Sequence, residues 1–257
     1  MVATVSIITV VRNNESGLAR TFESVLSQTY VDWELLIIVG PSDDGTAQFA
    51  LALTQLDSRI RAYIQNGIGI YSAMNDGLKE AKGEYVWFLN SGDEFEDRST
   101  LSYSIERVKS MGADLILGGY SVIEGGSTKQ YSKRAKRINK FEFAFNRRGG
   151  CHQSMIFRKN RVMDFGGFNL NYQLTSDFDL VLKVIEGGNS FRTEKVLARI
   201  DPGGISDQRI YHVIKEKHLL RGMHFPGNIP VYFISYIWGI SVRTKIKIGR
   251  FFMLISK

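Results

Sequence analysis

The chain has 257 residues, of which 44% are apolar and 23% are charged. This composition is typical of a globular protein with a sizeable core, and it excludes a collagen-like or wholly disordered chain. The length suits one large α/β domain or two small ones. The single cysteine, Cys151, excludes an intrachain disulfide and fits a reducing compartment.

The net charge of +7 is unevenly distributed along the chain. Residues 209–257 hold nine Lys or Arg and one acid, and residues 127–148 hold eight Lys or Arg and one acid. A basic chain often binds nucleic acid. Because the excess is local, it favours an anionic membrane surface or a phosphate-bearing acceptor instead, and we expect no nucleic-acid partner.

The first element is a run of apolar, mostly β-branched residues at 5–11, which predicts a strand buried on both faces. This places the N-terminus in a strand rather than in a signal peptide, which favours the cytosol. Asn13 or Asn14 then caps a helix in which the apolar residues between 18 and 26 share one face.

Strands and helices continue to alternate through the first half of the chain. This order predicts an open, mostly parallel sheet with right-handed crossovers. Further strands are expected at 35–39, 60–64 and 85–89, and further helices through 49–56 and 74–81.

Ligands bind such sheets at the carboxyl ends of the strands. The loops expected at that edge are polar, Gly-rich or acidic, so we expect the ligand site there. These loops are residues 12–14, 40–45, 66–71 and 90–93.

The second half has a weaker pattern. A strand or strand pair is expected at 114–122, and a helix is expected from near Asp177 to Gly187. The basic segment 127–148 has little periodicity, which predicts a mobile loop. Aromatic residues alternate at 141, 143 and 145 within it, which suggests a short edge strand or a docking surface.

The C-terminal stretch 229–240 is apolar and aromatic but shorter than the roughly 20 residues that span a bilayer. Basic residues and a second apolar run follow it. This pattern favours a segment lying at an anionic membrane surface. A C-terminal helix packed on the domain and a homodimer contact are the alternatives.

Acidic residues stand at two places in the chain where chemistry is expected. Asp93 follows the strand at 85–89, where a carboxylate can hold a divalent cation on a diphosphate or can cap the next turn. Asp177 and Asp179 begin a predicted helix, where acids act as caps or, in an inverting transfer, as a general base. The Gly67-x-Gly69 string lacks the third glycine of a dinucleotide fingerprint and is weak support for NAD.

Taken together, these segments resemble family 2 glycosyltransferases of the GT-A fold, especially bacterial members that build exopolysaccharide, colanic acid-like polymers, capsule or O-antigen. The most specific strings are Ser-Val-x-x-Gln-Thr-Tyr from Ser24 and Gly-Ile-Tyr-x-Ala-Met-Asn-x-Gly from Gly69. Matching segments occur in family order over about residues 5–206. They are residues 5–10, 24–30, 33–34, 42–46, 69–77, 83–93, 151–154, 166–169 and 176–180.

The resemblance implies the fold and its division. The fold is an α/β, GT-A type open, mostly parallel twisted sheet with helices on both faces, plus a C-terminal helical, amphipathic extension. Residues 1–208 form the glycosyltransferase domain, with a nucleotide-binding half over about 1–93 and an acceptor half over about 94–208. Residues 209–257 form the basic, apolar extension.

The resemblance also implies residue roles. Asp177 matches the catalytic base, and Asp93 matches the last acid of the family's metal-binding region. His152, Gln153 and Asp179 fall on the acceptor or diphosphate side. The residues implied in binding the nucleotide sugar are Thr9, Val10, Arg12, Asn13, Val39, Ser42, Asp44, Gly69, Asn75, Asn90, Ser91 and Gly92.

Departures from the family pattern limit these assignments. Val39 stands where many members carry an Asp that contacts the nucleobase, and Gly67 replaces another frequent Asp. Asn90 and Gly92 replace the first two acids of a fuller acidic cluster. With Asp93 as the one carboxylate there, we expect the donor diphosphate and water to hold most of the Mn²⁺ or Mg²⁺.

The sequence therefore predicts a metal-dependent inverting glycosyltransferase. It would move a sugar from a nucleotide-sugar donor, with a UDP-sugar favoured over a GDP-sugar, to a saccharide or lipid-linked saccharide acceptor in bacterial surface polysaccharide synthesis. The expected location is cytoplasmic and peripheral, on the inner face of the plasma membrane. The alternatives are a catalytically degenerate nucleotide-binding scaffold of a polysaccharide assembly complex and a nucleotide-dependent oxidoreductase.

Overall fold

The computed structural model describes residues 3–124, 127–145 and 150–227. Its contacts divide the chain into two compact units, residues 1–202 and 203–257. The first unit carries the sheet and all of the predicted site residues. The second unit, as far as it is described, is helical, with α8 (Ile205–Gln208) and α9 (Ile210–His224).

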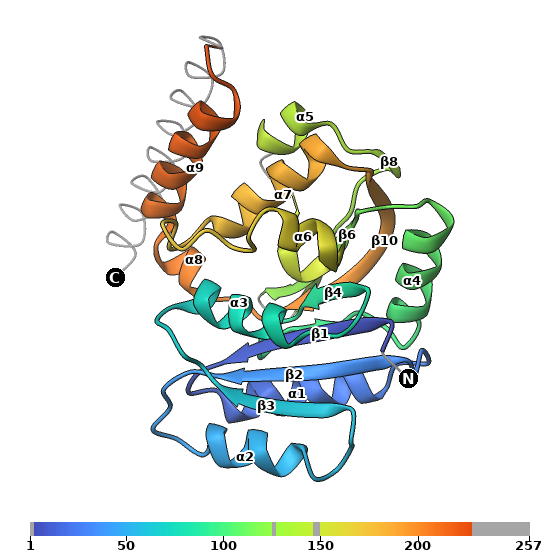
Figure 1. Ribbon diagram of the computed structural model, residues 1–257, viewed down its shortest axis with the longest axis vertical. Coiled ribbons are helices and arrows are strands. Elements are labelled where there is room, and N and C mark those ends of the chain that lie inside the picture. The colour runs from blue at the N-terminus through green and yellow to red at the C-terminus, as the bar shows by residue number, and fades with distance from the viewer. Residues whose placement is uncertain (1–2, 125–126, 146–149, 228–257) are drawn as a thin grey trace. The chain divides into compact units, whose positions relative to one another are not determined.

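The first half of the sheet unit alternates strands and helices, as the sequence predicts (Figure 1). Each predicted strand and helix of this half is present, with boundaries within a few residues. The elements are β1 (Val5–Val11), α1 (Glu15–Leu26), β2 (Trp33–Val39), α2 (Thr46–Leu53), β3 (Ile60–Ile64), α3 (Ile70–Glu80) and β4 (Tyr85–Phe88).

The second half adds strands to the far side of β4 and helices around them. Its elements are β5 (Glu94–Phe95), α4 (Thr100–Ser110), β6 (Leu115–Glu124), β7 (Ser127–Tyr131), β8 (Lys136–Arg137), α5 (Lys140–Phe145), the 3₁₀ turn η1 (His152–Ser154), β9 (Met155–Arg158), α6 (Lys159–Asp164), α7 (Ser176–Gly187) and β10 (Ser190–Ile200).

The strands form one sheet in the order β3-β2-β1-β4-β9-β6-β10-β5. β3, β2, β1 and β4 are parallel, and β10 is parallel to β6. β9 runs antiparallel between β4 and β6, and the short strands β5, β7 and β8 add antiparallel pairs. This arrangement confirms the predicted α/β fold with a mostly parallel central sheet.

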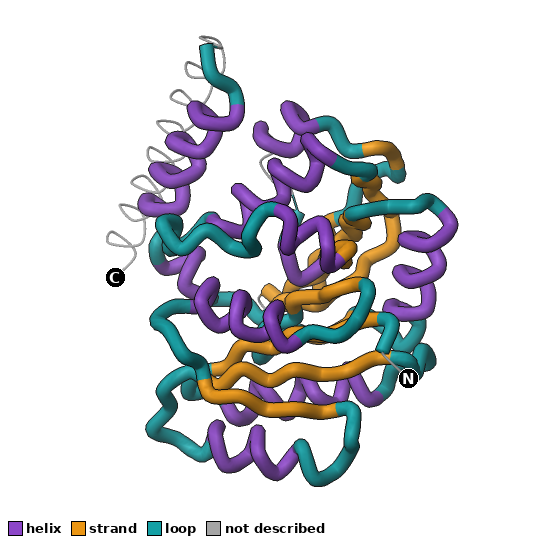
Figure 2. Tube along the Cα trace, in the orientation of Figure 1, coloured by secondary structure: helices purple, strands orange, loops and turns teal. Residues whose placement is uncertain are grey.

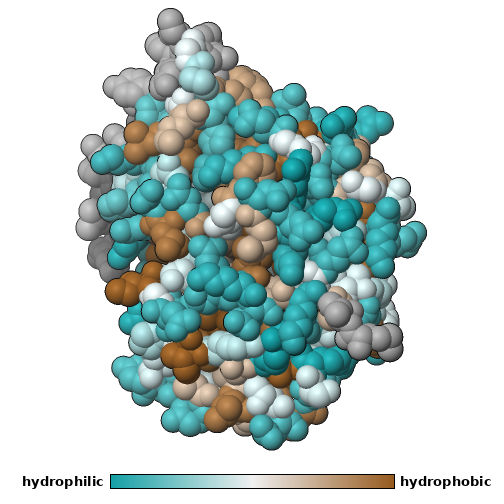
Figure 3. Space-filling model, in the orientation of Figure 1, coloured by the Kyte–Doolittle hydropathy of each residue, from teal (hydrophilic) through white to brown (hydrophobic). Residues whose placement is uncertain are grey.

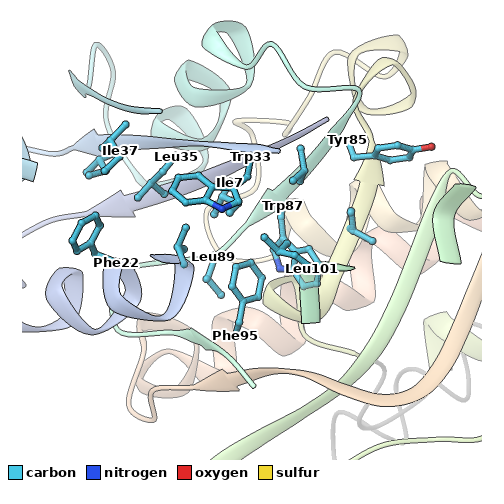
Figure 4. Close-up of a cluster of buried hydrophobic side chains, with 14 of the residues drawn as sticks. Ile7, Phe22, Trp33, Leu35, Ile37, Tyr85, Trp87, Leu89, Phe95 and Leu101 are labelled. Carbon is cyan, nitrogen blue, oxygen red and sulfur yellow. The ribbon is translucent and has the colours of Figure 1, made fainter. Parts of the chain in front are cut away.

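Helices cover both faces of the sheet (Figure 2). Alternate strand residues point to opposite faces, so Ile7 and Leu35 lie in one buried cluster with Phe22 of α1 (Figure 4). Ile8 and Ile38 lie on the other face, against α3. Because all of these residues are apolar, β1 and β2 are buried on both faces, as the continuous runs predict.

The basic segment 127–148 is more ordered than the sequence predicts, at least over the part that the structure describes. Instead of a loop, it contains β7, β8 and α5. The alternating phenylalanines lie in helix α5 and not in a strand, because the Asn139 side chain accepts a hydrogen bond from the Glu142 amide (3.1 Å) and starts a turn. Phe143 is buried and stacks on Phe178 (centroids 5.7 Å apart). Residues 146–148 lie outside the described part.

The apolar C-terminal run 229–257 also lies outside the described residues, so its predicted membrane contact stays a prediction. Within the described residues, no helix is long and apolar enough to cross a membrane. On the face shown in Figure 3, apolar side chains occur in small groups among hydrophilic ones.

The closest approach of α3 to the sheet is at Gly77. A Cβ there would lie 2.5 Å from Ile8 Cγ2 and 3.2 Å from Ile38 Cγ1. We therefore expect Gly77→Ala to overpack this contact and to lower the free energy of unfolding by about 1–3 kcal/mol, measured by urea denaturation. Gly204→Ala is the control, since no atom lies within 4 Å of its Cβ position. Equal stability of the two variants would contradict a tight contact between α3 and the sheet.

Candidate active site

The loops after β1, β2 and β4 meet at one edge of the sheet and are tied together by Asn13 and Asn14. The Asn13 amide donates to Ser42 Oγ (3.1 Å), and Asn13 Oδ1 accepts from the Asp43 amide (3.0 Å). Asn13 has a φ of 48°, in the left-handed region that Asn tolerates better than most residues. The predicted nucleotide residues Asn13 and Ser42 are thus brought together.

Asn14 joins three segments. Its side-chain Oδ1 caps α1 by accepting from the Gly17 amide (3.0 Å), and its own amide donates to Thr46 Oγ1 (3.0 Å) at the start of α2. Its carbonyl accepts from Ser91 Oγ (3.2 Å), in the loop after β4. The strand-tip loops therefore form one hydrogen-bonded platform.

Gly92 explains one departure from the family's acidic cluster. Its φ is 99°, and a Cβ at this position would lie 2.8 Å from Asp201 Oδ2. Its amide donates to Thr21 Oγ1 (2.9 Å) on α1. An Asp at this position would have a strained backbone and would face the carboxylate of Asp201. The loop conformation therefore favours Gly over Asp here.

Asp93, the predicted metal residue, lies beneath this loop and is only 4% exposed. Its Oδ1 accepts from the Asp201 amide (2.9 Å), and its Oδ2 accepts from Gln153 Nε2 (3.0 Å). Burial raises the pKa of Asp93 to about 6, although these two hydrogen bonds oppose the effect. The Asp93 carboxyl therefore loses its proton, and becomes charged, close to neutral pH.

The 3₁₀ turn η1 connects Asp93 to the predicted base. Its Gln153 bonds Asp93, while the neighbouring His152 places Nδ1 3.1 Å from Asp177 Oδ2. The turn is anchored from the core, because Trp87 Nε1 donates to the Gln153 carbonyl (2.7 Å). Two acids from distant parts of the sequence are thus held by adjacent residues.

Asp177 lies at the start of α7 and receives a second hydrogen bond, from the Tyr71 hydroxyl to Oδ1 (2.8 Å). On the other side of the imidazole, Asn90 Nδ2 lies 3.3 Å from His152 Nε2. When this amide donates to Nε2, the ring proton sits on Nδ1 and is donated to Asp177. The Asp177 side chain retains 28% exposure and can therefore meet a ligand.

Tyr71 is a site residue that sequence reasoning does not assign. It lies inside the Gly-Ile-Tyr string, near the start of α3, and its ring stacks on Phe168 (centroids 5.3 Å apart). The sequence places it at the end of the expected loop 66–71, and the structure buries it to 7% exposure. Only the fold shows that its hydroxyl reaches the start of α7.

The two acids that begin α7 differ in surroundings. Asp179 is 4% exposed, and its Oδ2 accepts from Lys183 Nζ (2.6 Å), one turn further along the helix. Lys183 and Asp179 thus form an i, i+4 ion pair that stabilises the helix. The place of Asp179 on the acceptor or diphosphate side stays a prediction.

Several predicted nucleotide residues have structural partners of their own. Asp44 Oδ1 accepts from the Thr46 amide (3.0 Å) at the start of α2, and Asn75 exchanges two 2.8 Å hydrogen bonds with the Phe168 backbone. Thr9, Val10 and Val39 are buried. Arg12 is exposed beside the platform, and Gly69 precedes α3 with a φ of 90°.

The described residues do not form a preassembled metal centre, since they contain no group of three or more His, Cys, Asp or Glu that could hold an ion. Each Asp93 oxygen accepts one hydrogen bond, and a carboxylate oxygen has two lone pairs. Asp93 can therefore offer one ligand to a cation whose other ligands come from a diphosphate and water, as the sequence predicts.

Comparison with known families decides the class of the protein. Residues 6–169 match the model of the family described as "Glycosyl transferase family 2". The chain belongs to this family. It is a glycosyltransferase, and the match includes the strand-tip platform, Asp93 and η1.

Relatives and solved structures agree with this assignment. An uncharacterised glycosyltransferase of Mycobacterium tuberculosis is 28% identical over 210 residues, covering 80% of this chain and 78% of the relative. A PGL/p-HBAD biosynthesis glycosyltransferase of Mycobacterium bovis is 27% identical over 180 residues, covering 69% and 68%.

Two solved structures share the fold. Staphylococcus aureus TarS in complex with UDP superposes with a TM-score of 0.69 at 17% identity, covering 85% of this chain and 65% of that one. The mannosyltransferase PcManGT of Pyrobaculum calidifontis, in complex with GDP-Man and Mn²⁺, gives a TM-score of 0.63 at 12% identity, covering 94% and 75%. The chain thus spans slightly less than two thirds of the TarS chain. These likenesses confirm the GT-A fold.

The buried carboxyl of Asp93 has a consequence for stability. Between its ordinary pKa of 3.8 and about 6, the folded state binds more protons than the unfolded state, so the free energy of unfolding falls as pH rises through this window. We expect Asp93→Asn to be more stable than the wild type by about 1–3 kcal/mol at pH 7.5 and to lose this advantage at pH 4, measured by denaturant unfolding.

Asp97→Asn provides a control of opposite sign. The pKa of Asp97 is lowered: its burial would raise it, but the hydrogen bond from Lys195 and those from Ser99 outweigh this effect. This variant should lose stability at pH 7.5. A destabilised Asp93→Asn at pH 7.5 would show that the hydrogen bonds of the carboxylate outweigh the cost of burying its charge.

Proposed function

We propose that this glycosyltransferase transfers a sugar from a nucleotide-sugar donor to a saccharide or lipid-linked saccharide acceptor with inversion at the anomeric carbon. The observation that carries the proposal is the position of Asp177. Its carboxylate is oriented by Tyr71 and His152, remains partly exposed, and stands next to the turn that contacts Asp93. A single oriented carboxylate is what an inverting transfer requires.

The donor would occupy the platform at the strand tips. The hydrogen-bonded loops after β1, β2 and β4 hold polar groups at the edge where open α/β sheets bind nucleotides. Arg12, which is exposed there, supplies a positive charge for the diphosphate. TarS was solved with UDP and PcManGT with GDP-Man, which supports a nucleotide-sugar donor, and a UDP-sugar is our first choice.

The transfer requires two events: the acceptor hydroxyl loses its proton, and negative charge moves to the departing nucleoside diphosphate. As the acceptor hydroxyl attacks the anomeric carbon, Asp177 Oδ2 or Oδ1 takes its proton, and the sugar–phosphate bond breaks with its electron pair on the nucleoside diphosphate. The hydrogen bonds from Tyr71 and His152 keep the carboxylate from rotating away.

Asp93 would contribute one carboxylate ligand to a divalent cation, Mn²⁺ or Mg²⁺, that arrives with the donor. Such a cation offsets the charge that develops on the departing diphosphate. Because the pKa of Asp93 is about 6, the carboxyl becomes protonated below this pH and then no longer supplies a charged ligand. Transfer should therefore decline as pH falls through about 6.

The basic charge of residues 209–257 supports a peripheral position on the inner face of the plasma membrane, next to a lipid-linked acceptor. In this proposal the chain is cytoplasmic and takes part in surface polysaccharide synthesis. Residues 209–257 are an extension outside the 1–208 transferase domain. The apolar run of this extension contacts lipid or a second copy of the chain. The PGL/p-HBAD biosynthesis relative supports a biosynthetic role.

A second candidate is a catalytically degenerate scaffold that binds the nucleotide sugar without transferring it. The observation that favours it is the thinned acidic cluster, in which Asn90 and Gly92 precede Asp93. The intact arrangement of Asp177, His152 and Tyr71 favours the enzyme. Donor binding without transfer or donor hydrolysis would decide for the scaffold.

The role of Asp177 can be tested directly. Asp177→Asn should lower kcat by about a thousandfold, since general-base catalysis contributes roughly 10²–10⁴. Donor affinity, measured by isothermal titration calorimetry, should change less than about threefold because the residue does not bind the donor in this proposal. Asp164→Asn is the control, an exposed acid outside the site. Turnover within about tenfold of the wild type would remove Asp177 from the role.

The metal should bind together with the nucleotide. We expect Mn²⁺ alone to bind with millimolar or weaker affinity in calorimetry and to bind much more tightly once UDP or GDP is present. A thermal-shift panel with UDP, GDP, CMP and dTDP, each with and without Mn²⁺, then identifies the donor class. Micromolar Mn²⁺ binding to the nucleotide-free protein would contradict the single-carboxylate site.

A further inference from the structure

A cavity with polar and charged lining residues lies beyond the candidate active site, against the β6–β7 hairpin and β10. Its volume is about 200 Å³, below the roughly 300–1,000 Å³ of pockets that hold a whole drug-sized ligand. It therefore suits a single chemical group rather than an entire nucleotide sugar. Its polar side chains include Tyr120, Gln130, Tyr131, Lys133 and Arg192.

Arg192 is the most unusual of these residues because its charged side chain is only 4% exposed. Nη1 donates to Glu142 Oε1 (3.1 Å), but Nη2 has no hydrogen-bond partner among the residues that the structure describes. A buried guanidinium with an unused donor is costly, so such a group calls for an acceptor. None of the assigned roles in sugar transfer uses this donor.

The charges around the cavity do not cancel. Glu142, which pairs with Arg192, also pairs with Lys136 (2.5 Å), so one carboxylate serves two cations. The pKa of Lys133 is lowered by its partial burial and then by the nearby Arg192 charge. Three cations therefore face one acid, and an anion in the cavity would relieve their repulsion.

The cavity shares a wall with the candidate active site. Gly118 and Gly150 line it, and the Gly118 carbonyl accepts from Ser154 Oγ (3.2 Å), the last residue of η1. Ser154 Oγ also donates to the Cys151 carbonyl (2.8 Å), just before His152. A ligand group in the cavity would thus lie on the opposite side of the turn that holds Asp93 and Asp177.

We propose that this cavity is an acceptor subsite for an anionic group, a phosphate or a carboxylate, bound by Arg192 and Lys133. The inference rests on the proposed function and narrows it, because it makes the acceptor an anionic saccharide or a saccharide phosphate. Tyr120, Gln130 and Tyr131 supply neutral groups around the charge. Lys133, in the basic segment 127–148, would then bind an anionic acceptor group, which is a role distinct from membrane attachment.

Binding is tested with inorganic phosphate on the full chain, with UDP and Mn²⁺ saturating so that the diphosphate site is filled. At constant ionic strength, phosphate should shift the amide NMR signals of Gly118 and Gly150 saturably. Lys133→Ala should weaken this affinity about fivefold, an effect limited by the partial exposure of Lys133. Arg134→Ala, which removes the neighbouring exposed charge outside the cavity lining, should leave it unchanged.

Transfer assays then separate a free anion from an acceptor group. An octyl glycoside and the same glycoside with a 6-phosphate are compared, and the phosphorylated acceptor should show a KM about tenfold lower, a preference that Lys133→Ala reduces. Absence of saturable phosphate shifts up to 50 mM, about fifty times a dissociation constant of 1 mM, would overturn the anion site. Shifts with equal use of both glycosides would overturn the acceptor role. Shifts with no transfer to either would reject the proposed function and the acceptor role together, and leave an anion site.

Discussion

The arrangement of the site depends on a three-residue turn. η1 places His152 against Asp177 and Gln153 against Asp93, while the Trp87 indole fixes the turn from the core. Because adjacent residues on a short, tight turn have little independent freedom, the two acids cannot move far relative to each other. The surroundings of Asp93 and of Asp177 are therefore coupled through backbone that enters β9, the antiparallel strand between β4 and β6.

This coupling depends on the antiparallel direction of β9. The parallel strands β1, β2 and β4 bring their carboxyl ends to one edge and build the platform. An additional parallel strand after β4 would enter the sheet from the far edge. The antiparallel β9 instead begins at the platform edge, so the turn before it can reach both Asp93 and Asp177.

The core supports the site at a cost in stability. Asp93 is buried next to apolar residues such as Trp87 and Phe95, whose rings pack edge to face (4.9 Å). The hydrogen bonds from Gln153 and the Asp201 amide oppose the effect of burial on the pKa of this carboxyl, which is raised to about 6. Packing alone would not favour a buried carboxylate at this position, and the proposed role of Asp93 as a metal ligand would account for it.

The fold was largely predictable, because β1, β2 and β4 are largely apolar, buried runs and helices separate the strands of the first half. The edge-strand interpretation of Phe141, Phe143 and Phe145 was wrong, since the Asn139 cap outweighs a two-residue pattern over such a short stretch. The hydroxyl of Tyr71 and the amide of Asp201 were not predictable as partners of the two acids, because those contacts join segments far apart in sequence. The roles of Asp93 and Asp177 stay predictions that the geometry supports.

The most direct test of the central claim, that one oriented carboxylate drives an inverting transfer, is the anomeric configuration of the first product. It is measured by ¹H NMR with the α-linked nucleotide sugar that stabilises the protein most. An attack activated by Asp177 from the face opposite the diphosphate gives a β-linked product. An α-linked product would require a different mechanism and would contradict the role of Asp177 as the base of an inverting transfer.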